Sequence, residues 1–173
     1  DSLEKELNEN SKILLGGDLE IDYNNREGDK QLISKVEKFS TVSQMVEFST
    51  MISTIGKKEN KTSFTRIKAI DQNYPLYGNV IYHPPGSLKS LNEIDSTIIV
   101  NENIFKNLNL KINDLVKVQN KEFKVVGIVK VLPDIGGAFV FGDFALTGNN
   151  TLDKLELNTL GSFLNYEYKI KFK

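Results

Sequence analysis

The chain has 173 residues, with 22 Lys and Arg against 23 Asp and Glu, a formal net charge of -1 and no cysteine. The balanced charge gives no global field for nucleic acid or an acidic membrane, and the lack of cysteine excludes disulfides, thiolate metal sites and cysteine nucleophiles. No apolar run reaches the roughly 20 residues of a membrane helix, and a chain of this length buries roughly 70% of its unfolded surface, enough for one domain or two small subdomains.

The first part of the chain predicts two helices and three strands. Helical spacing of apolar residues places one helix at 2–14, ended by a glycine pair, and a second at 29–39, capped by Asp29. Alternating or β-branched segments predict the strands at 18–23, 41–55 and 62–71. The resulting order of strand, helix and two strands predicts an α+β fold with the helix on one face of a sheet.

The second part is richer in short strands. Residues 82–86, with two prolines and a glycine, predict a loop, and Asn101 is expected to cap a helix. The remaining predicted elements are strands at 97–100, 138–146 and 162–173, a β-hairpin of 115–119 with 122–131, and a short helix at 151–157.

Several large apolar side chains have two interpretations. Phe139 and Phe141 alternate onto one strand face with Phe144 nearby, and Met45 and Met51 share one side of the long predicted strand. We favour core packing for all of them. The alternative is an interaction surface for lipid or a partner, because exposed aromatic patches and adaptable methionines recur at such surfaces.

Candidate catalytic residues are few. His83 is the single histidine, which excludes histidine metal clusters and histidine-dependent triads, and a solvated loop explains it. The carboxylate pairs Glu20/Asp22 and Glu93/Asp95 have a spacing that suits acid/base chemistry or a hard cation. We favour solvated surface positions for both pairs.

Basic and glycine-rich segments carry no clear ligand motif. The cluster around Lys57, Lys58 and Lys61 contains a glutamate and no aromatic residue, so a solvated turn explains it better than nucleic-acid binding. The two glycine pairs of the chain, at 16–17 and 136–137, lack the patterns of phosphate-binding loops.

Three segments in this order resemble a known family. They are LLGGDLEI at 14–21, IKAIDQNYPLYG at 67–78 and VNENIFKNLNLKINDLVKV at 100–118. Together they resemble the extracytoplasmic domain of FtsX-like ABC transporter permeases with a MacB-type periplasmic core, and within that family the YbbP-type permeases. The residues that carry the resemblance are structural: Gly16, Gly17, Asp18, Lys68, Asp71, Tyr74, Pro75 and Gly78.

The resemblance implies a MacB-type core made of two subdomains. A porter-like α+β subdomain would comprise 1–73 and 133–173, and a β-rich, sabre-like subdomain at 74–132 would be inserted into it. Pro133, Gly136 and Gly137 then form the second linker and a candidate hinge.

The resemblance also implies a function. The complete protein would be a permease of the cytoplasmic (inner) membrane with this domain facing the periplasm, working as a dimer or permease pair with a cytoplasmic ABC ATPase subunit. The domain would bind a lipid, lipoprotein, peptide or periplasmic protein, or transmit force to it, with no covalent chemistry, cofactor, metal or nucleic acid. The alternative is a stand-alone periplasmic lipid- or protein-binding module, and an enzyme is a distant third.

Overall fold

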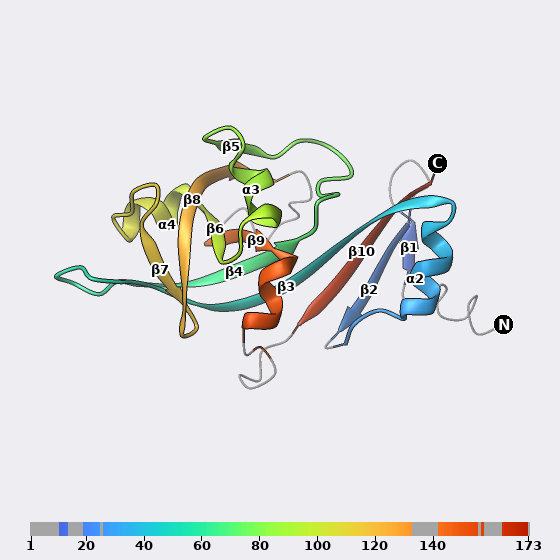
Figure 1. Ribbon diagram of the computed structural model, residues 1–173, viewed down its shortest axis with the longest axis horizontal. Coiled ribbons are helices and arrows are strands. Elements are labelled where there is room, and N and C mark those ends of the chain that lie inside the picture. The colour runs from blue at the N-terminus through green and yellow to red at the C-terminus, as the bar shows by residue number, and fades with distance from the viewer. Residues whose placement is uncertain are drawn as a thin grey trace.

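The computed structural model describes residues 11–13, 19–24, 26–132, 142–155, 157 and 164–172. These residues form a ten-stranded mixed sheet with short helices, so the predicted α+β class is confirmed (Figure 1). The elements in chain order are β1 (Ser11–Ile13), β2 (Leu19–Asn24), α2 (Lys30–Glu37), β3 (Ser40–Thr54), β4 (Thr62–Ile70), β5 (Ile81–His83), α3 (Ser87–Glu93), β6 (Thr97–Asn101), α4 (Glu102–Asn107), β7 (Leu115–Val118), β8 (Lys121–Val131), β9 (Phe144–Gly148), the 3-10 helix η1 (Asn149–Lys154) and β10 (Asn165–Phe172).

Six of the strands close into a barrel. β3 pairs with β4, β4 with β9, β9 with β6, β6 with β8, β8 with β7, and β7 returns to β3. The β4–β9 and β6–β8 pairs are parallel and the other four are antiparallel. Because the ring of strand pairs is closed, each of these strands has a hydrogen-bonded neighbour on both sides.

The largest core fills this barrel. Residues that alternate inward along the six strands meet there, and Ile104 of α4 and Leu108, directly after α4, pack on the same cluster. The α4 helix starts at its expected cap, since the Asn101 side chain accepts a hydrogen bond from the Ile104 backbone N–H at 3.1 Å. The inward side chains are Val46, Phe48, Ile52, Ile67, Ala69, Ile98, Val100, Val116, Val118, Phe123, Val125 and Ala145.

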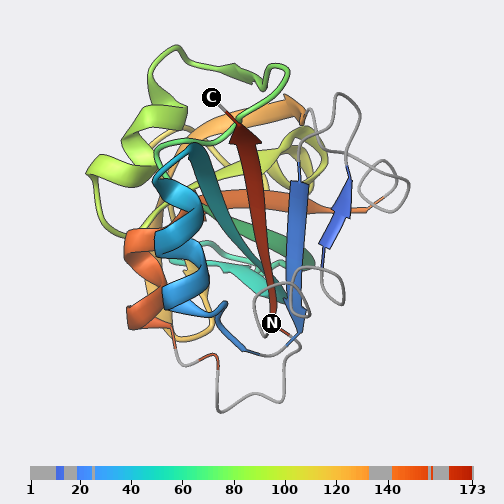
Figure 2. The same cartoon turned by 90° about the vertical axis from the view of Figure 1, so that its right-hand side faces the viewer.

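An open sheet extends from the barrel along β3. The first half of β3 pairs with β10, β10 pairs with β2, and β2 pairs with β1. The α2 helix lies against one face of this sheet, where Leu32 and Val36 pack with Ile21, Tyr23 and other buried residues (Figure 2). As predicted, Asp29 caps α2, and its Oδ1 accepts hydrogen bonds from the backbone N–H groups of Gln31 at 2.8 Å and Leu32 at 3.2 Å.

Two local predictions were wrong. The end of the predicted helix at 2–14 is strand β1, which pairs with β2, and the rest of that helix lies outside the described residues. The predicted loop at 82–86 overlaps strand β5 and leads into helix α3, which the sequence did not predict. β1 and β5 have three residues each, too few for a periodic pattern in the sequence. Helix α3 starts after Gly86 with no side-chain cap, so no capping residue marks its start.

The division into subdomains at 74 and 133 stays a prediction. The segment 74–132 contributes β5, β6, β7 and β8, and the barrel core combines their side chains with those of β3 and β4. Within the described residues, no helix is long and apolar enough to cross a membrane.

Candidate functional site

The turn after β4 is tied to β3 through Asp71. Its carboxylate accepts hydrogen bonds from the Ser43 hydroxyl at 2.9 Å, the Gln44 backbone N–H at 2.7 Å and the Asn73 backbone N–H at 3.0 Å. Burial raises the pKa of Asp71, and these hydrogen bonds oppose the rise. Asp71 thus extends the contact between β3 and β4 beyond their last register pair, Met45 with Ile70.

The rest of this turn is held on the same strand. The Asn73 side-chain amide donates to the Val42 carbonyl at 2.9 Å, and Tyr74 is buried in a second core cluster. Pro75 follows through a cis peptide bond, and Gly78 has a φ of 68°, which favours glycine. The turn at the start of the segment 74–132, called the joint below, therefore contains four residues of the predicted family motif: Asp71, Tyr74, Pro75 and Gly78.

A cavity of about 480 Å³ opens beside this joint. Its walls combine the last residue of β4 and residues of the joint with residues of β5 and α3, and they include the Lys89–Glu93 ion pair, at 3.5 Å. The other lining residues are Ile70, Gln72, Tyr74, Tyr82, Leu88 and Asn92. Sequence reasoning missed the helical part of this wall because α3 was not predicted.

We expect Asp71→Ala to lower the free energy of unfolding by about 2–3 kcal/mol, because the part-buried Gln44 N–H and the Ser43 hydroxyl would lose their acceptor. Urea unfolding followed by circular dichroism measures this change. The matched control is Asp153→Ala, at an exposed carboxylate, with an expected change within about 0.5 kcal/mol. Equal losses in the two variants would contradict the structural role of Asp71.

A charged cluster occupies the open sheet. Carboxylate oxygens of Glu20, Asp22 and Glu167 lie within 4.8 Å of one another, and the Lys169 Nζ is 3.6 Å from the Glu167 carboxylate. Glu20 is 4% exposed, so the solvated position expected for it was wrong. Lys68, whose charge acts on Glu167, is 5% exposed. The cluster forms because β10 pairs with β2 and brings Glu167 opposite Asp22, a contact with no local signal in the sequence.

Glu167 is the carboxyl group of this cluster with a strongly raised pKa. Burial, and then a hydrogen bond to Glu20 and its negative charge, raise the pKa of Glu167 to about 8, while Lys68 and Lys169 oppose the rise. The raised pKa keeps Glu167 protonated at neutral pH, which reduces the negative charge that Lys68 and Lys169 face. This reduced charge favours a buried ion network over a cation site, although carboxylates at this spacing are suitable ligands for hard cations.

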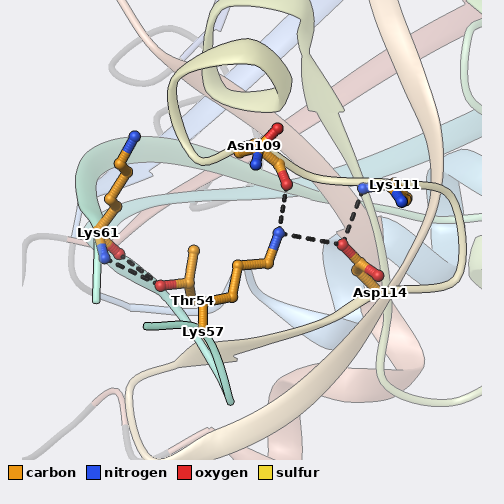
Figure 3. A network of polar contacts seen from close by, with 6 residues as sticks. All are labelled: Thr54, Lys57, Lys61, Asn109, Lys111 and Asp114. Carbon is orange, nitrogen blue, oxygen red and sulfur yellow. Dashed lines mark hydrogen bonds and ion pairs between the residues drawn. The ribbon is translucent and has the colours of Figure 1, made fainter. Parts of the chain in front are cut away.

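The tip of the β3–β4 hairpin is fixed to the barrel (Figure 3). The Lys57 Nζ donates a hydrogen bond to the Asn109 carbonyl and lies 3.4 Å from the Asp114 carboxylate. The same carboxylate accepts the Lys111 backbone N–H at 2.8 Å, and the Thr54 hydroxyl accepts the Lys61 N–H at 2.9 Å. Lys57 is therefore part of the structure that joins the hairpin to the end of α4.

The candidate apolar surface residues lie in different places. Met45 and Phe144 are 1% and 5% exposed and pack in the second core cluster, so they are not on the surface of this chain. Met51 is 44% exposed on the outer wall of the barrel, opposite Phe64, which is 68% exposed. Outside the described residues lie Phe139, Phe141, Pro133, Gly136, Gly137, Gly16, Gly17 and Asp18.

The structure does not join the remaining candidates into a catalytic group. His83 is exposed at the end of β5. Glu93 pairs with Lys89, and Asp95 pairs with Lys154, so this second carboxylate pair forms two separate surface ion pairs.

The fold is that of the extracytoplasmic domains of MacB-type ABC transporters. The periplasmic region of MacB from Actinobacillus actinomycetemcomitans superposes with a TM-score of 0.57 over 100% of this chain and 80% of its own, at 12% identity. The extracellular domain of the noncanonical ABC-type transporter YknZ from Gram-positive bacteria has a TM-score of 0.51 over 98% of this chain and 78% of its own, at 11% identity.

The sequence is similar to that of one particular permease. The ABC transporter permease YbbP of Escherichia coli strain K12 is 25% identical over 171 residues, which are 98% of this chain and 20% of YbbP. The chain thus spans about a fifth of the length of this curated relative. No family model matches the chain. The resemblance to MacB-type and YbbP-type permeases predicted from the sequence is confirmed.

Proposed function

We propose that this chain is the extracytoplasmic domain of an FtsX-like ABC transporter permease and that it transmits motion to, or binds, a lipid, lipoprotein, peptide or partner protein. The observation that carries the proposal is the similarity to a permease along 98% of the chain, together with a fold shared with two transporter domains. Under this proposal the domain lies outside the cytoplasmic membrane, and a cytoplasmic ATPase subunit supplies the energy. The domain itself performs no covalent chemistry.

The strand β3 suits a domain that transmits motion. Its 15 residues span about 50 Å, at roughly 3.3 Å per residue. The first half pairs with β10 of the open sheet, and the last residues pair with β7 of the barrel. A displacement applied to the open sheet is therefore carried to the barrel through one continuous strand.

The test uses the complete gene product. We expect it to fractionate with membranes, to contain membrane helices on both sides of this domain and to co-purify with an ABC ATPase. A complete protein without membrane helices would overturn the proposal and favour the stand-alone binding module.

A second experiment tests force transmission. We expect the double variant Gly136→Pro, Gly137→Pro to uncouple ATP hydrolysis from transport or from cargo co-purification, because a hinge must absorb backbone rotation. The matched control is Glu59→Pro, at an exposed bend in the tip of the β3–β4 hairpin, where we expect coupling to be retained. Unchanged coupling in a folded hinge variant would contradict a hinge at this place.

A further inference from the structure

Two solvent-exposed aromatic rings stack on each other at one end of the open sheet. Phe39 follows α2 and Phe172 lies near the end of β10, and their ring centroids are 6.4 Å apart with an interplanar angle of 7°. Phe39 is 56% exposed and Phe172 is 41% exposed. The pair is held in place by the backbone, since Phe172 is opposite Ser40 in the β10–β3 register.

Three lysines lie near this aromatic pair in the chain, and Lys171, next to Phe172 in β10, is on the opposite face of the sheet. Lys35 and Lys38 are exposed and share one side of α2 by their spacing, and Lys171 lies with its Nζ 5.2 Å from the centre of the Tyr77 ring. The nearby acid Glu37 lies on another side of α2, where it lines a groove with Gln44 and Tyr168. The rim is therefore locally basic although the chain as a whole has a net charge of -1.

The position of this rim is set by the direction of the chain. The chain leaves β10 at this end of the sheet, where Ile170 is opposite Leu19 of β2. The strand before β2, β1, starts at Ser11 opposite Ile21 and runs toward the same end. The tip of the β3–β4 hairpin lies at the opposite end of the molecule (Figure 1). If the segment after β10 leads into a membrane helix, as in the proposed function, this end of the sheet is the one closest to the bilayer.

We propose that the aromatic–lysine rim, made of Phe39, Phe172, Tyr77, Lys35, Lys38 and Lys171, rests on the outer surface of the lipid bilayer. Aromatic rings are favoured at the level of the lipid headgroups, where their apolar bodies reach the acyl boundary. Lysine side chains extend along such a surface and place their ammonium groups against anionic headgroups. The orientation of the rim toward the membrane rests on the proposed function. Through this contact the domain stays against the membrane surface while it moves.

The chain offers a clean reporter because it contains no tryptophan. Phe172→Trp places a single indole in the rim, and Phe64→Trp places one on the barrel wall as the matched control, at a side chain that is also exposed. Each folded variant is titrated with vesicles of phosphatidylcholine containing anionic phosphatidylglycerol, and with vesicles whose acyl chains are brominated. We expect a blue shift and bromine quenching for the reporter at position 172, and neither for the reporter at position 64.

The lysines give a second readout. Sedimentation with the same anionic vesicles is expected to weaken about fivefold for each of Lys35→Gln and Lys38→Gln, since each lysine near the surface contributes about 1 kcal/mol. Phosphatidylcholine alone or high salt should remove this part of the binding. Phe39→Ser, in a variant shown to be folded by circular dichroism, is expected to reduce sedimentation as well.

The outcomes separate this inference from the proposed function. Equal spectra for the two reporters, or binding that does not depend on Lys35 and Lys38, would overturn the membrane contact even if the complete protein is a membrane permease. A complete protein without membrane helices would overturn the proposed function, and vesicle binding through position 172 would still support a lipid-facing rim.

Discussion

Gly148→Ala is expected to lower the free energy of unfolding by about 3–5 kcal/mol, because the added methyl group has no room at the end of β9. A Cβ at this position would lie 2.0 Å from the Leu91 carbonyl oxygen and 2.8 Å from the Leu91 carbonyl carbon. Both are backbone atoms of α3, and Leu91 is fully buried in the second core cluster. The helix must therefore move away from the sheet, which exposes the apolar side of α3.

A second variant separates this backbone clash from a side-chain clash. The same Cβ would lie 2.1 Å from the Asn150 Oδ1, a side chain that Asn150→Ala removes. We expect the double variant Gly148→Ala, Asn150→Ala to stay nearly as unstable as Gly148→Ala alone, because the contact with Leu91 remains. Urea unfolding of the three variants measures this, and full recovery of stability in the double variant would contradict the clash with α3.

The elements that the sequence predicted correctly have local signals. The long strand at 41–55 is rich in β-branched and aromatic residues, and the structure has β3 at Ser40–Thr54. The caps Asp29 and Asn101 mark the starts of α2 and α4, and the hairpin of β7 and β8 lies close to its predicted place. Each of these features depends on residues that are near one another in the chain.

The barrel and the charged cluster have no such signal. The barrel closes through the parallel pairs β4–β9 and β6–β8, and the first of these joins Arg66 to Phe144 across a long stretch of sequence. Glu167 and Lys68 enter the cluster with Glu20 only after β2, β10, β3 and β4 are placed side by side. The order of the three family-like segments identified the fold through resemblance. The contacts within the barrel and the charged cluster depend on the register between distant strands.

The same dependence on register explains the one surface that the sequence did not suggest. Phe39 and Phe172 are separated by most of the chain, and each alone looks like an ordinary end-of-element aromatic residue. The β10–β3 pairing stacks them and brings Lys171 to the same end as Lys35 and Lys38. The candidates that the sequence did suggest, Met45 and Phe144, pack inside, in the second core cluster with Leu91 of α3.

Glu167→Gln is expected to stabilise the domain above neutral pH. The pKa of Glu167 rises from its ordinary value of 4.5 to about 8 in the folded chain, so the folded chain holds a proton that the unfolded chain releases. The favourable contribution of this proton to the free energy of unfolding is therefore fully present below pH 4.5 and is lost as pH rises toward 8. Glutamine has a similar shape to the protonated acid, donates a hydrogen bond to Glu20 and does not ionise.

The prediction concerns the difference in the free energy of unfolding between the Glu167→Gln variant and the natural chain. We expect it to be near zero at about pH 4.5 and to grow to about 2–3 kcal/mol at about pH 8.5, a value reduced from the full shift because the group keeps partial access to solvent. Urea unfolding across this pH range measures the difference, and Glu122→Gln, at an exposed side chain of β8, is the matched control, with an expected change within about 0.5 kcal/mol. A difference for Glu167→Gln that does not change with pH would mean that the two lysines already hold all three carboxylates ionised. The charged cluster of the open sheet would then carry a net negative charge.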